Sequence, residues 1–302
     1  MLSSLLLTLV ATYDGVLPST LGRANYAATL ARLTEVADGL GDQLHADPGP
    51  KPLTCSDLFR LRAHQRNDGA ARRLSASQIL VRTGDRFQIH LTGLTPTVSQ
   101  ALLAAFVEQP PTTWVVNNYT FQVEQTLCDA EVDSWTGCTT YEALAAHPIL
   151  AGRPFAPQIT LAFLSPTSFE SNNLHIPLPL PNLVFGSLVD RWNRFSPLLK
   201  LAPELRQQMA ETVAISHYEL RSAAVPQKSG PDGRSQGSTP LHIGAEGYVT
   251  YTIAGKSSEQ RLRVELISKL QTLANFAMYS GVGVKTTTGM GQCRRIIHAK
   301  PA

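Results

Sequence analysis

Several features that mark particular protein classes are missing from this chain of 302 residues. It holds only four cysteines and no C-x-x-C pair, which argues against a disulfide framework and against a cysteine-based metal site. We expect Cys55, Cys128, Cys138 and Cys293 to be reduced and mostly in the core. No stretch approaches the roughly 20 apolar residues of a membrane span, so no membrane association is expected.

Charge of either sign is also modest. The chain has 26 Lys and Arg against 23 Asp and Glu, a formal net charge of +3. This balance permits a polyanionic partner without requiring one, because a nucleic-acid binder needs its basic residues clustered on one face. The apolar run at residues 1–13 has neither the basic n-region nor the small-residue cleavage site of a signal peptide. It therefore predicts a buried strand in a cytoplasmic protein.

The most distinctive stretch that is present lies at residues 280–295, where two Gly-x-Gly pairs flank a basic, hydroxyl-rich centre. The glycines are Gly281, Gly283, Gly289 and Gly291, and the centre includes Lys285, Thr286 and Thr287. Glycine permits a positive φ, and backbone N–H groups freed in this way beside a lysine can cradle phosphate. The segment follows a predicted helix and precedes a predicted strand, the reverse of the order in P-loops and dinucleotide sites, and it has no Gly-Lys-Ser/Thr step. A mononucleotide P-loop is therefore not expected.

Hydrophobic periodicity in the first half predicts the order strand, helix, strand, strand, helix, strand. The expected elements are a strand at 2–13, a loop at 15–20, a helix at 25–44, a strand at 52–61, a hairpin of 78–83 with 86–91, a helix from Thr95-Pro96 and strands within 113–124. Threonine before proline is a typical helix start, and Gly84-Asp85 is a typical hairpin turn. The order is that of the ferredoxin-like fold.

The second half repeats this order. We expect a short helix at 140–146, a strand at 158–163, a turn-rich extension at 165–175, helices at 181–195 and 204–209, a strand at 213–224, a loop at 226–240, two strands within 241–253, a helix at 261–279 and a strand at 292–298. The predicted fold is α+β, with two tandem ferredoxin-like (RRM-like) domains at 1–127 and 157–302 joined by a connector at 128–156. The glycine-rich loop belongs to the second domain.

Two stretches together resemble the CRISPR-associated endoribonucleases of the repeat-associated mysterious protein (RAMP) superfamily. One is the G-x-G-x5-G-x-G loop at 281–292, and the other is Leu44-His45-Ala-Asp-Pro-Gly-Pro-Lys51, a His-x5-Lys after the first predicted helix. The resemblance spans the chain, because the order of elements between the two stretches also agrees. It implies an antiviral-defence enzyme that cuts CRISPR repeat RNA (pre-crRNA) into guide RNAs without metal or cofactor. The 2′-OH attacks the adjacent phosphate and leaves 2′,3′-cyclic phosphate and 5′-OH ends.

The resemblance also implies roles for two residues of the first domain. His45 stands where the family has a general acid or base, and Lys51 matches a lysine that stabilises charge on the phosphate. The residues alone leave other roles open: His45 could cap the end of a helix, Lys51 could be an ordinary exposed lysine, and Gly281 could be a helix C′ residue. Some family members add a tyrosine on the first helix, where this chain has Leu30.

A third catalytic residue therefore stays undecided between Arg32, Tyr26 and His64. The residues expected to bind RNA are Gly281, Gly283, Lys285, Thr286, Thr287, Gly289, Gly291, Arg294, Arg72 and Arg73. Basic residues that share one face would bind phosphates with a strong salt dependence, although each group could equally be a solvated surface. The histidines have no partners at metal-ligand spacing, so no metal site is expected.

Two other functions stay open at this point. One is a non-catalytic RNA-binding subunit of a CRISPR interference complex, which would keep the glycine loop and cut nothing. The other is a small-molecule enzyme that uses the loop to bind a nucleotide. The expected partners are CRISPR repeat RNA and other CRISPR-associated proteins, and the protein is expected to be a monomer or a homodimer.

Overall fold

The computed structural model describes residues 1–61, 73–75, 78–150, 157–198, 200–226, 241–253 and 260–296. The chain divides into two compact units. The N-terminal unit is Leu2–Cys138 with Thr287–Met290, and the C-terminal unit is Thr139–Thr286 with Gly291–Ala302 and Met1. The domain boundaries expected at residues 127 and 157 stay a prediction. Of the described helices, none has both the length and the apolar content to span a bilayer.

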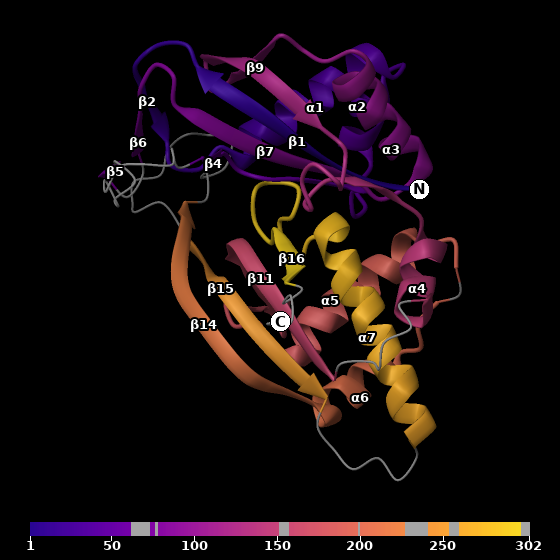
Figure 1. Cartoon of the computed structure of the whole chain (residues 1–302). Helices are drawn as coiled ribbons and strands as arrows, with labels where there is room; N and C mark the ends of the chain where they lie inside the picture. Colours follow the sequence, from indigo (N-terminus) through magenta and orange to yellow (C-terminus); the bar gives the residue numbers. More distant parts are fainter. Residues whose placement is uncertain are drawn as a thin grey trace. The chain divides into compact units, whose positions relative to one another are not determined.

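The N-terminal unit is built on an antiparallel sheet with the strand order β3-β7-β1-β9-β8. Its strands are β1 (Leu2–Ala11), β2 (Gly15–Pro18), β3 (Leu53–Cys55), β4 (Phe59–Arg60), β5 (Arg73–Ser75), β6 (Gln78–Val81), β7 (Arg86–Gly93), β8 (Thr113–Val116), β9 (Tyr119–Leu127) and β10 (Gly137–Thr139). Its helices are α1 (Gly22–Val36), α2 (Leu40–Ala46) and α3 (Pro96–Leu103), which a π-helical turn (Ala104–Glu108) continues. The helices cover one face of the sheet (Figure 1).

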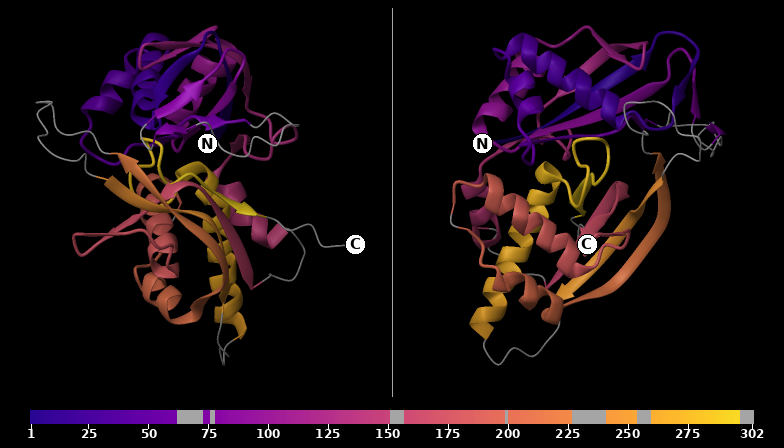
Figure 2. Two further views of the ribbon diagram at one scale, coloured as in Figure 1. Left: turned by 90° about the vertical axis from the view of Figure 1, so that its left-hand side faces the viewer. Right: turned by 180° about the vertical axis from the view of Figure 1, so that it is seen from behind.

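The core of this unit follows from the alternation of side chains along β1. Leu5, Leu7 and Leu9 point to one face, where they join Leu33 of α1 and Leu102 of α3 in a buried cluster. Thr95 caps α3 as its sequence predicts, since its hydroxyl accepts a hydrogen bond from the Val98 amide at 3.4 Å. Figure 2 shows the helices and the sheet of this unit from two further directions.

The single helix predicted at 25–44 is wrong, because the chain forms α1 and α2 with a break between them. Asp38 (φ 48°) and Gly39 (φ 72°) adopt the left-handed conformation that ends a helix. The second helix folds back so closely that a Cβ at Gly41 would lie 1.9 Å from the Leu30 carbonyl oxygen. Hydrophobic spacing did not reveal the break, because apolar positions of both helices, such as Leu44, face the same core.

The hairpin predicted around Gly84-Asp85 is also wrong, although Gly84 does form a turn with φ +84°. Strand β6 pairs with β2 and β5, whereas β7 pairs with β1, β3 and β4, so the turn connects two different sheets. The segment predicted as a loop at 15–20 contains β2, whose Gly15 lies opposite Val81 of β6. Local sequence predicts a strand but does not identify its partner.

The C-terminal unit repeats the arrangement with the strand order β14-β15-β11-β16. Its strands are β11 (Gln158–Thr167), β12 (Phe169–Ser171), β13 (Leu174–Ile176), β14 (Val213–Pro226), β15 (Leu241–Ile253) and β16 (Cys293–Ile296). Its helices are α4 (Tyr141–Leu150), α5 (Pro181–Phe195), α6 (Glu204–Thr212) and α7 (Gln260–Ser280). Helices α5, α6 and α7 lie on one side of the sheet (Figure 1). The predicted α+β fold with two ferredoxin-like units is confirmed.

One strand prediction in this unit is wrong. Residues 241–253 form the single strand β15 rather than two strands. The strand continues through Gly247, which has φ +128° and approaches β14 so closely that a Cβ would lie 2.0 Å from the Glu219 carbonyl oxygen. A glycine inside a strand often marks such a close approach of another backbone. Of the loop predicted at 226–240, Pro226 ends β14, and residues 227–240 lie outside the described part of the chain.

Candidate functional site

His45 and Lys51 belong to the turn that leads from α2 to β3. Asp47 organises this turn: its carboxylate accepts a hydrogen bond from the Gly49 amide at 2.7 Å, and its carbonyl accepts one from the Lys51 ammonium. Lys51 therefore folds back onto the backbone two residues beyond His45. The His45 side chain is exposed and, within the described residues, makes no hydrogen bond or ion pair. The contact with a carbonyl near the end of α2 is thus made by Lys51 and not by His45.

The three candidates for a third catalytic residue differ in their surroundings. Arg32 donates to the carbonyls of Ala105 (3.2 Å) and Gln109 (2.6 Å), so its guanidinium caps the end of the π-helical turn. The Tyr26 hydroxyl is enclosed without a hydrogen-bond partner among the described residues, and burial raises the pKa of Tyr26. His64 lies outside the described residues.

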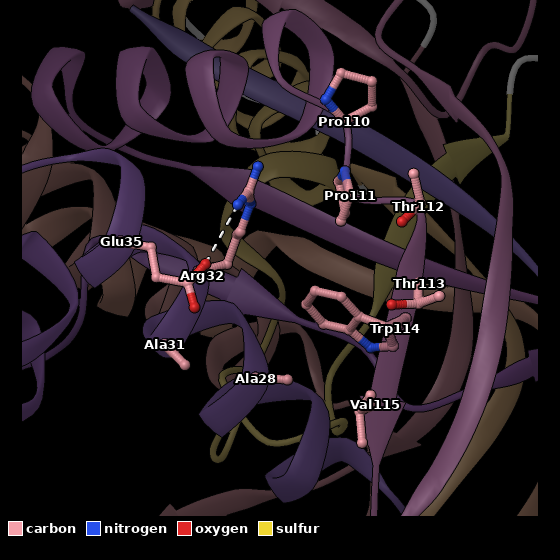
Figure 3. A pocket seen from close by; sticks show the side chains of 10 residues that line it. All are labelled: Ala28, Ala31, Arg32, Glu35, Pro110, Pro111, Thr112, Thr113, Trp114 and Val115. Atoms are coloured by element: carbon pink, nitrogen blue, oxygen red, sulfur yellow. Dashed lines mark hydrogen bonds and ion pairs between the residues drawn. The ribbon is translucent and has the colours of Figure 1, made fainter.

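A surface pocket of about 530 Å³ lies between α1 and the segment that enters β8 (Figure 3). Arg32 and Glu35 line it and form an ion pair at 3.2 Å, while Trp114 lies on the opposite side. Neither His45 nor Lys51 lines this pocket. The residues proposed for chemistry therefore lie on an open turn rather than in this hollow.

All four glycines of the glycine-rich loop have positive φ: Gly281 (63°), Gly283 (78°), Gly289 (99°) and Gly291 (69°). At two of them a side chain would also collide with the backbone. A Cβ at Gly283 would lie 2.2 Å from the Ser168 carbonyl oxygen, and one at Gly291 would lie 2.2 Å from the Val282 carbonyl oxygen. The loop needs glycine there for its own packing.

The amide groups of this loop mostly donate hydrogen bonds within the protein. The bonds run from Val282 to the Gly291 carbonyl (2.8 Å), from Gly283 to the Ser187 hydroxyl (2.8 Å), from Val284 to the Ser168 carbonyl (3.0 Å), from Gly289 to the Cys55 carbonyl (3.0 Å) and from Gly291 to the Pro166 carbonyl (3.1 Å). The sequence-based expectation that positive φ leaves amides free for phosphate is wrong for these five groups. Internal carbonyls and one hydroxyl satisfy them first.

The side chains at the centre of the loop have separate environments. Thr286 is 1% exposed, and its hydroxyl accepts a hydrogen bond of 2.6 Å from Arg191 of α5. Burial lowers the pKa of Arg191 to about 10. Lys285 and Thr287, in contrast, keep partial exposure. Thr286 thus anchors the loop to α5, and its neighbours present their side chains to solvent.

Lys285 also lies near a histidine pair that no sequence pattern predicted. The rings of His175 and His242 are 4.3 Å apart, and His242 Nε2 is 2.5 Å from the Ser168 hydroxyl. Burial, then the charge of Lys285, and then His175 lower the pKa of His242. These residues come from β13, β15 and the turn after β11, so only the folded chain brings them together.

The tip of the loop, Thr287–Met290, belongs to the N-terminal unit. Gly289 forms a parallel bridge with Ser56, and a Cβ at Gly22 would lie 2.3 Å from the Thr288 carbonyl oxygen. Beside them the Asp57 carboxylate accepts hydrogen bonds from the amides of Leu21 (2.7 Å) and Leu58 (2.8 Å). Burial raises the pKa of Asp57 to about 6 despite these bonds. No motif or spacing in the sequence indicates a role for Asp57.

The two arginines of β16 point to opposite faces of the sheet, because side chains alternate along a strand. Arg295 donates to Asn275 (3.0 Å) and Gln271 (3.2 Å) of α7, so Arg294 faces away from that helix. Arg294 keeps partial exposure. Arg73 begins β5, and Arg72 lies outside the described residues. In the described ranges, no group of three His, Cys, Asp or Glu side chains is arranged to hold a metal ion.

Comparison with known proteins gives concordant matches. The family model described as CRISPR-associated endoribonuclease Cas6 matches residues 161–293. A CRISPR-associated endoribonuclease Cas6 of Mycobacterium tuberculosis is 27% identical over 152 residues, which are 48% of this chain and 41% of that protein. The corresponding protein of Streptococcus thermophilus is 26% identical over 138 residues, 44% of this chain and 48% of that one. The chain thus aligns with less than half the length of these curated relatives.

Solved structures match over a greater length. A product complex of a Thermus thermophilus Cas6 is 26% identical, with a TM-score of 0.70, and the match covers 98% of this chain and 100% of that one. A product complex of another Cas6 protein has a TM-score of 0.69 at 24% identity, covering 98% and 99% of the two chains. At that identity the second match supports the fold alone. The fold likeness extends over nearly the whole chain.

Proposed function

We propose that this chain is a CRISPR-associated endoribonuclease of the Cas6 type, which cuts CRISPR repeat RNA into guide RNAs. The observation that supports this most directly is the match, over 98% of the chain, to a Cas6 structure that is a product complex. The exposed His45, with a lysine held in the same turn, supplies groups suited to the reaction.

In the proposed reaction the ribose 2′-OH attacks the adjacent phosphate. Neutral imidazole has one nitrogen that accepts a proton, and imidazolium can donate one, so His45 can accept the 2′-OH proton or protonate the leaving 5′-oxygen. Lys51 contributes positive charge against the phosphorane, which carries more negative charge than the starting diester. The products are a 2′,3′-cyclic phosphate and a 5′-OH. None of these steps requires a metal ion.

RNA binding is assigned mainly to side chains. Lys285, Thr287 and Arg294 keep partial exposure and can contact phosphates, whereas the loop glycines act by giving the loop its shape. Arg72 and Arg73 remain in the proposed binding set as sequence predictions. Because the contacts are mostly with the RNA backbone, affinity should fall steeply with salt.

The test is cleavage of the repeat RNA encoded near the gene, in EDTA, with mapping of the product ends. We expect one cut per repeat with cyclic-phosphate and 5′-OH ends, and no cut when the nucleotide before the scissile bond is 2′-deoxy. A requirement for added Mg²⁺, or 5′-phosphate ends, would contradict the mechanism. Tight RNA binding without any cut would instead favour a non-catalytic subunit. Binding of ATP without binding of RNA would favour the nucleotide enzyme.

A further inference from the structure

Two of the four cysteines are neighbours in the folded N-terminal unit. The sulfur atoms of Cys128, just after β9, and Cys138, in β10, are 3.5 Å apart. Cys138 is exposed and Cys128 is half-buried, whereas Cys55 and Cys293 are buried. The sequence predicts four reduced cysteines, mostly in the core, and the C-x9-C spacing gives no sign of a pair.

The backbone holds this pair in place without help from the sulfur atoms. Thr136 closes the intervening loop, since its hydroxyl donates to the Asp129 carbonyl at 2.7 Å and accepts from the Asp129 amide at 3.0 Å. Gly137 has φ +123°, and a Cβ there would lie 3.1 Å from the Ala130 Cβ. Because other bonds already order the loop, linking the two sulfurs requires little further loss of conformational freedom.

The contact between the sulfurs also makes the two thiols chemically unequal. The contact between the two sulfurs lowers the pKa of Cys138 and raises that of Cys128, which favours the thiolate at Cys138. The thiolate is the species that attacks a disulfide. The more acidic sulfur is also the exposed one, which is the arrangement that a reactive cysteine with a resolving partner requires.

We propose that Cys128 and Cys138 form a redox modification site, a dithiol that low-molecular-weight disulfides convert to an intramolecular disulfide. The Cys138 thiolate attacks one sulfur of oxidised glutathione, which gives a mixed disulfide and releases one glutathione thiolate. The Cys128 thiol loses its proton and attacks the Cys138 sulfur, which releases the second glutathione. Two protein thiols are oxidised, one glutathione disulfide is reduced, and the two protons end on the two glutathione molecules released.

The bond requires the sulfurs to approach from 3.5 Å to about 2.05 Å, which is a small adjustment of two side chains. It would fix the loop that carries Trp135 against the sheet. The Trp135 ring stacks on the His90 ring with centroids 4.4 Å apart, and the backbone carbonyl of Trp135 accepts a hydrogen bond of 2.7 Å from the Ser4 hydroxyl. Oxidation should therefore stabilise the N-terminal unit where this loop covers β1 and β7.

The test incubates the full chain with increasing ratios of oxidised to reduced glutathione, followed by acid quenching, alkylation and peptide mass spectrometry. We expect a linked peptide pair that joins Cys128 to Cys138 and lacks two hydrogens, while Cys55 and Cys293 remain alkylatable after unfolding. The oxidised protein should melt about 5 °C higher, and a reductant should reverse this shift. No link at any ratio, or a link that lowers Tm, would overturn the proposal.

Two serine variants separate the roles of the two sulfurs. Cys128→Ser should stop at the mixed disulfide on Cys138, because the resolving thiol is absent. Cys138→Ser should react with oxidised glutathione at least about 10-fold more slowly than the wild type. The only thiol of the pair that remains in this variant is that of Cys128, which is less acidic and less exposed than that of Cys138. Equal reactivity of the two variants would show that proximity alone, without the division into attacking and resolving thiol, accounts for any link. That result would overturn the assigned sequence of steps.

Discussion

The turn at residues 45–51 and the glycine-rich loop at residues 281–291 are both short irregular segments, yet they are held in different ways. In the turn, His45 is exposed, and one aspartate and one lysine make the local bonds. In the loop, amides donate inward, glycines touch carbonyls, and Thr286 is buried against Arg191. The turn leaves the His45 side chain available, and the loop uses most of its polar groups for its own shape.

This difference shows that a glycine motif can specify geometry without providing the contacts to a ligand. A positive φ brings backbone segments close together, and the first polar groups that the freed amides meet are those of the protein itself. Chemistry and RNA contact are then left to exposed side chains. Substitutions in the turn should therefore affect activity, and substitutions in the loop should first affect stability.

The largest effect is expected from His45→Ala. Loss of a general acid or base typically costs 10²–10⁴-fold in rate, so cleavage should fall by about that factor while RNA binding and the free energy of unfolding stay unchanged. Single-turnover cleavage, filter binding and urea unfolding measure the three quantities. His147→Ala is the matched control, because His147 is also an exposed histidine in the last turn of a helix. Cleavage at the wild-type rate by His45→Ala protein would remove His45 from the mechanism.

Gly291→Ala should produce the next largest effect, on stability. Its Cβ would lie 2.2 Å from a backbone carbonyl at φ +69°, so we expect a loss of about 3 kcal/mol or more in the free energy of unfolding. Gly39→Ala is the control, because Gly39 has nearly the same φ (+72°) with nothing within 4 Å of the added Cβ. Gly39→Ala should cost only about 1 kcal/mol, the cost of left-handed backbone for alanine. Equal losses would show that φ alone, and not the packed loop, requires glycine.

Thr286→Val tests the anchor between the loop and α5. Valine keeps the volume but leaves the Arg191 guanidinium without its hydroxyl acceptor, so the C-terminal unit should lose about 1–3 kcal/mol. Thr287→Val, at a partly exposed neighbour, should change stability by less than about 0.5 kcal/mol. Chemical unfolding of both variants decides the comparison. A larger loss in Thr287→Val would reverse the roles assigned to the two threonines.

The smallest effect is expected at Asp57, as a change in the free energy of unfolding with pH. Its pKa is about 6 in the folded chain against 3.8 as the ordinary value, so its contribution to stability is fully present below about pH 4 and is lost as pH rises through 6. The shift corresponds to about 3 kcal/mol, and we expect about 1–2 kcal/mol because the residue keeps partial exposure.

Asp57→Asn, which does not titrate, should therefore gain stability relative to the wild type between pH 4 and pH 7. Urea unfolding of both proteins across this range measures the difference. Asp42→Asn, at an exposed position of α2, is the matched control. A wild-type minus Asp57→Asn difference that is flat with pH would contradict the raised pKa.

Part of the molecule followed directly from local sequence. The periodic apolar residues at 181–195 and the Thr95-Pro96 start predicted α5 and α3 correctly, because a helix depends on neighbours three and four positions away. The sequence also indicated both glycine pairs. It did not indicate the break at Asp38-Gly39, or that the strands on either side of Gly84 belong to different sheets. Those features depend on which distant segment each strand meets.

The sequence by itself determined the two ferredoxin-like units, the resemblance carried by the two short stretches, and the candidates His45 and Lys51. These depend on the order of elements and on residue identity at fixed spacing, which are properties of the chain. Only the tertiary structure decided where the hydrogen bonds of the loop go, that Thr286 is buried, that Asp57 holds amides at the start of α1, and that Cys128 meets Cys138. Each of these joins residues that are distant in the sequence or share no pattern, and the physical reason is that burial and hydrogen-bond partners are set by packing.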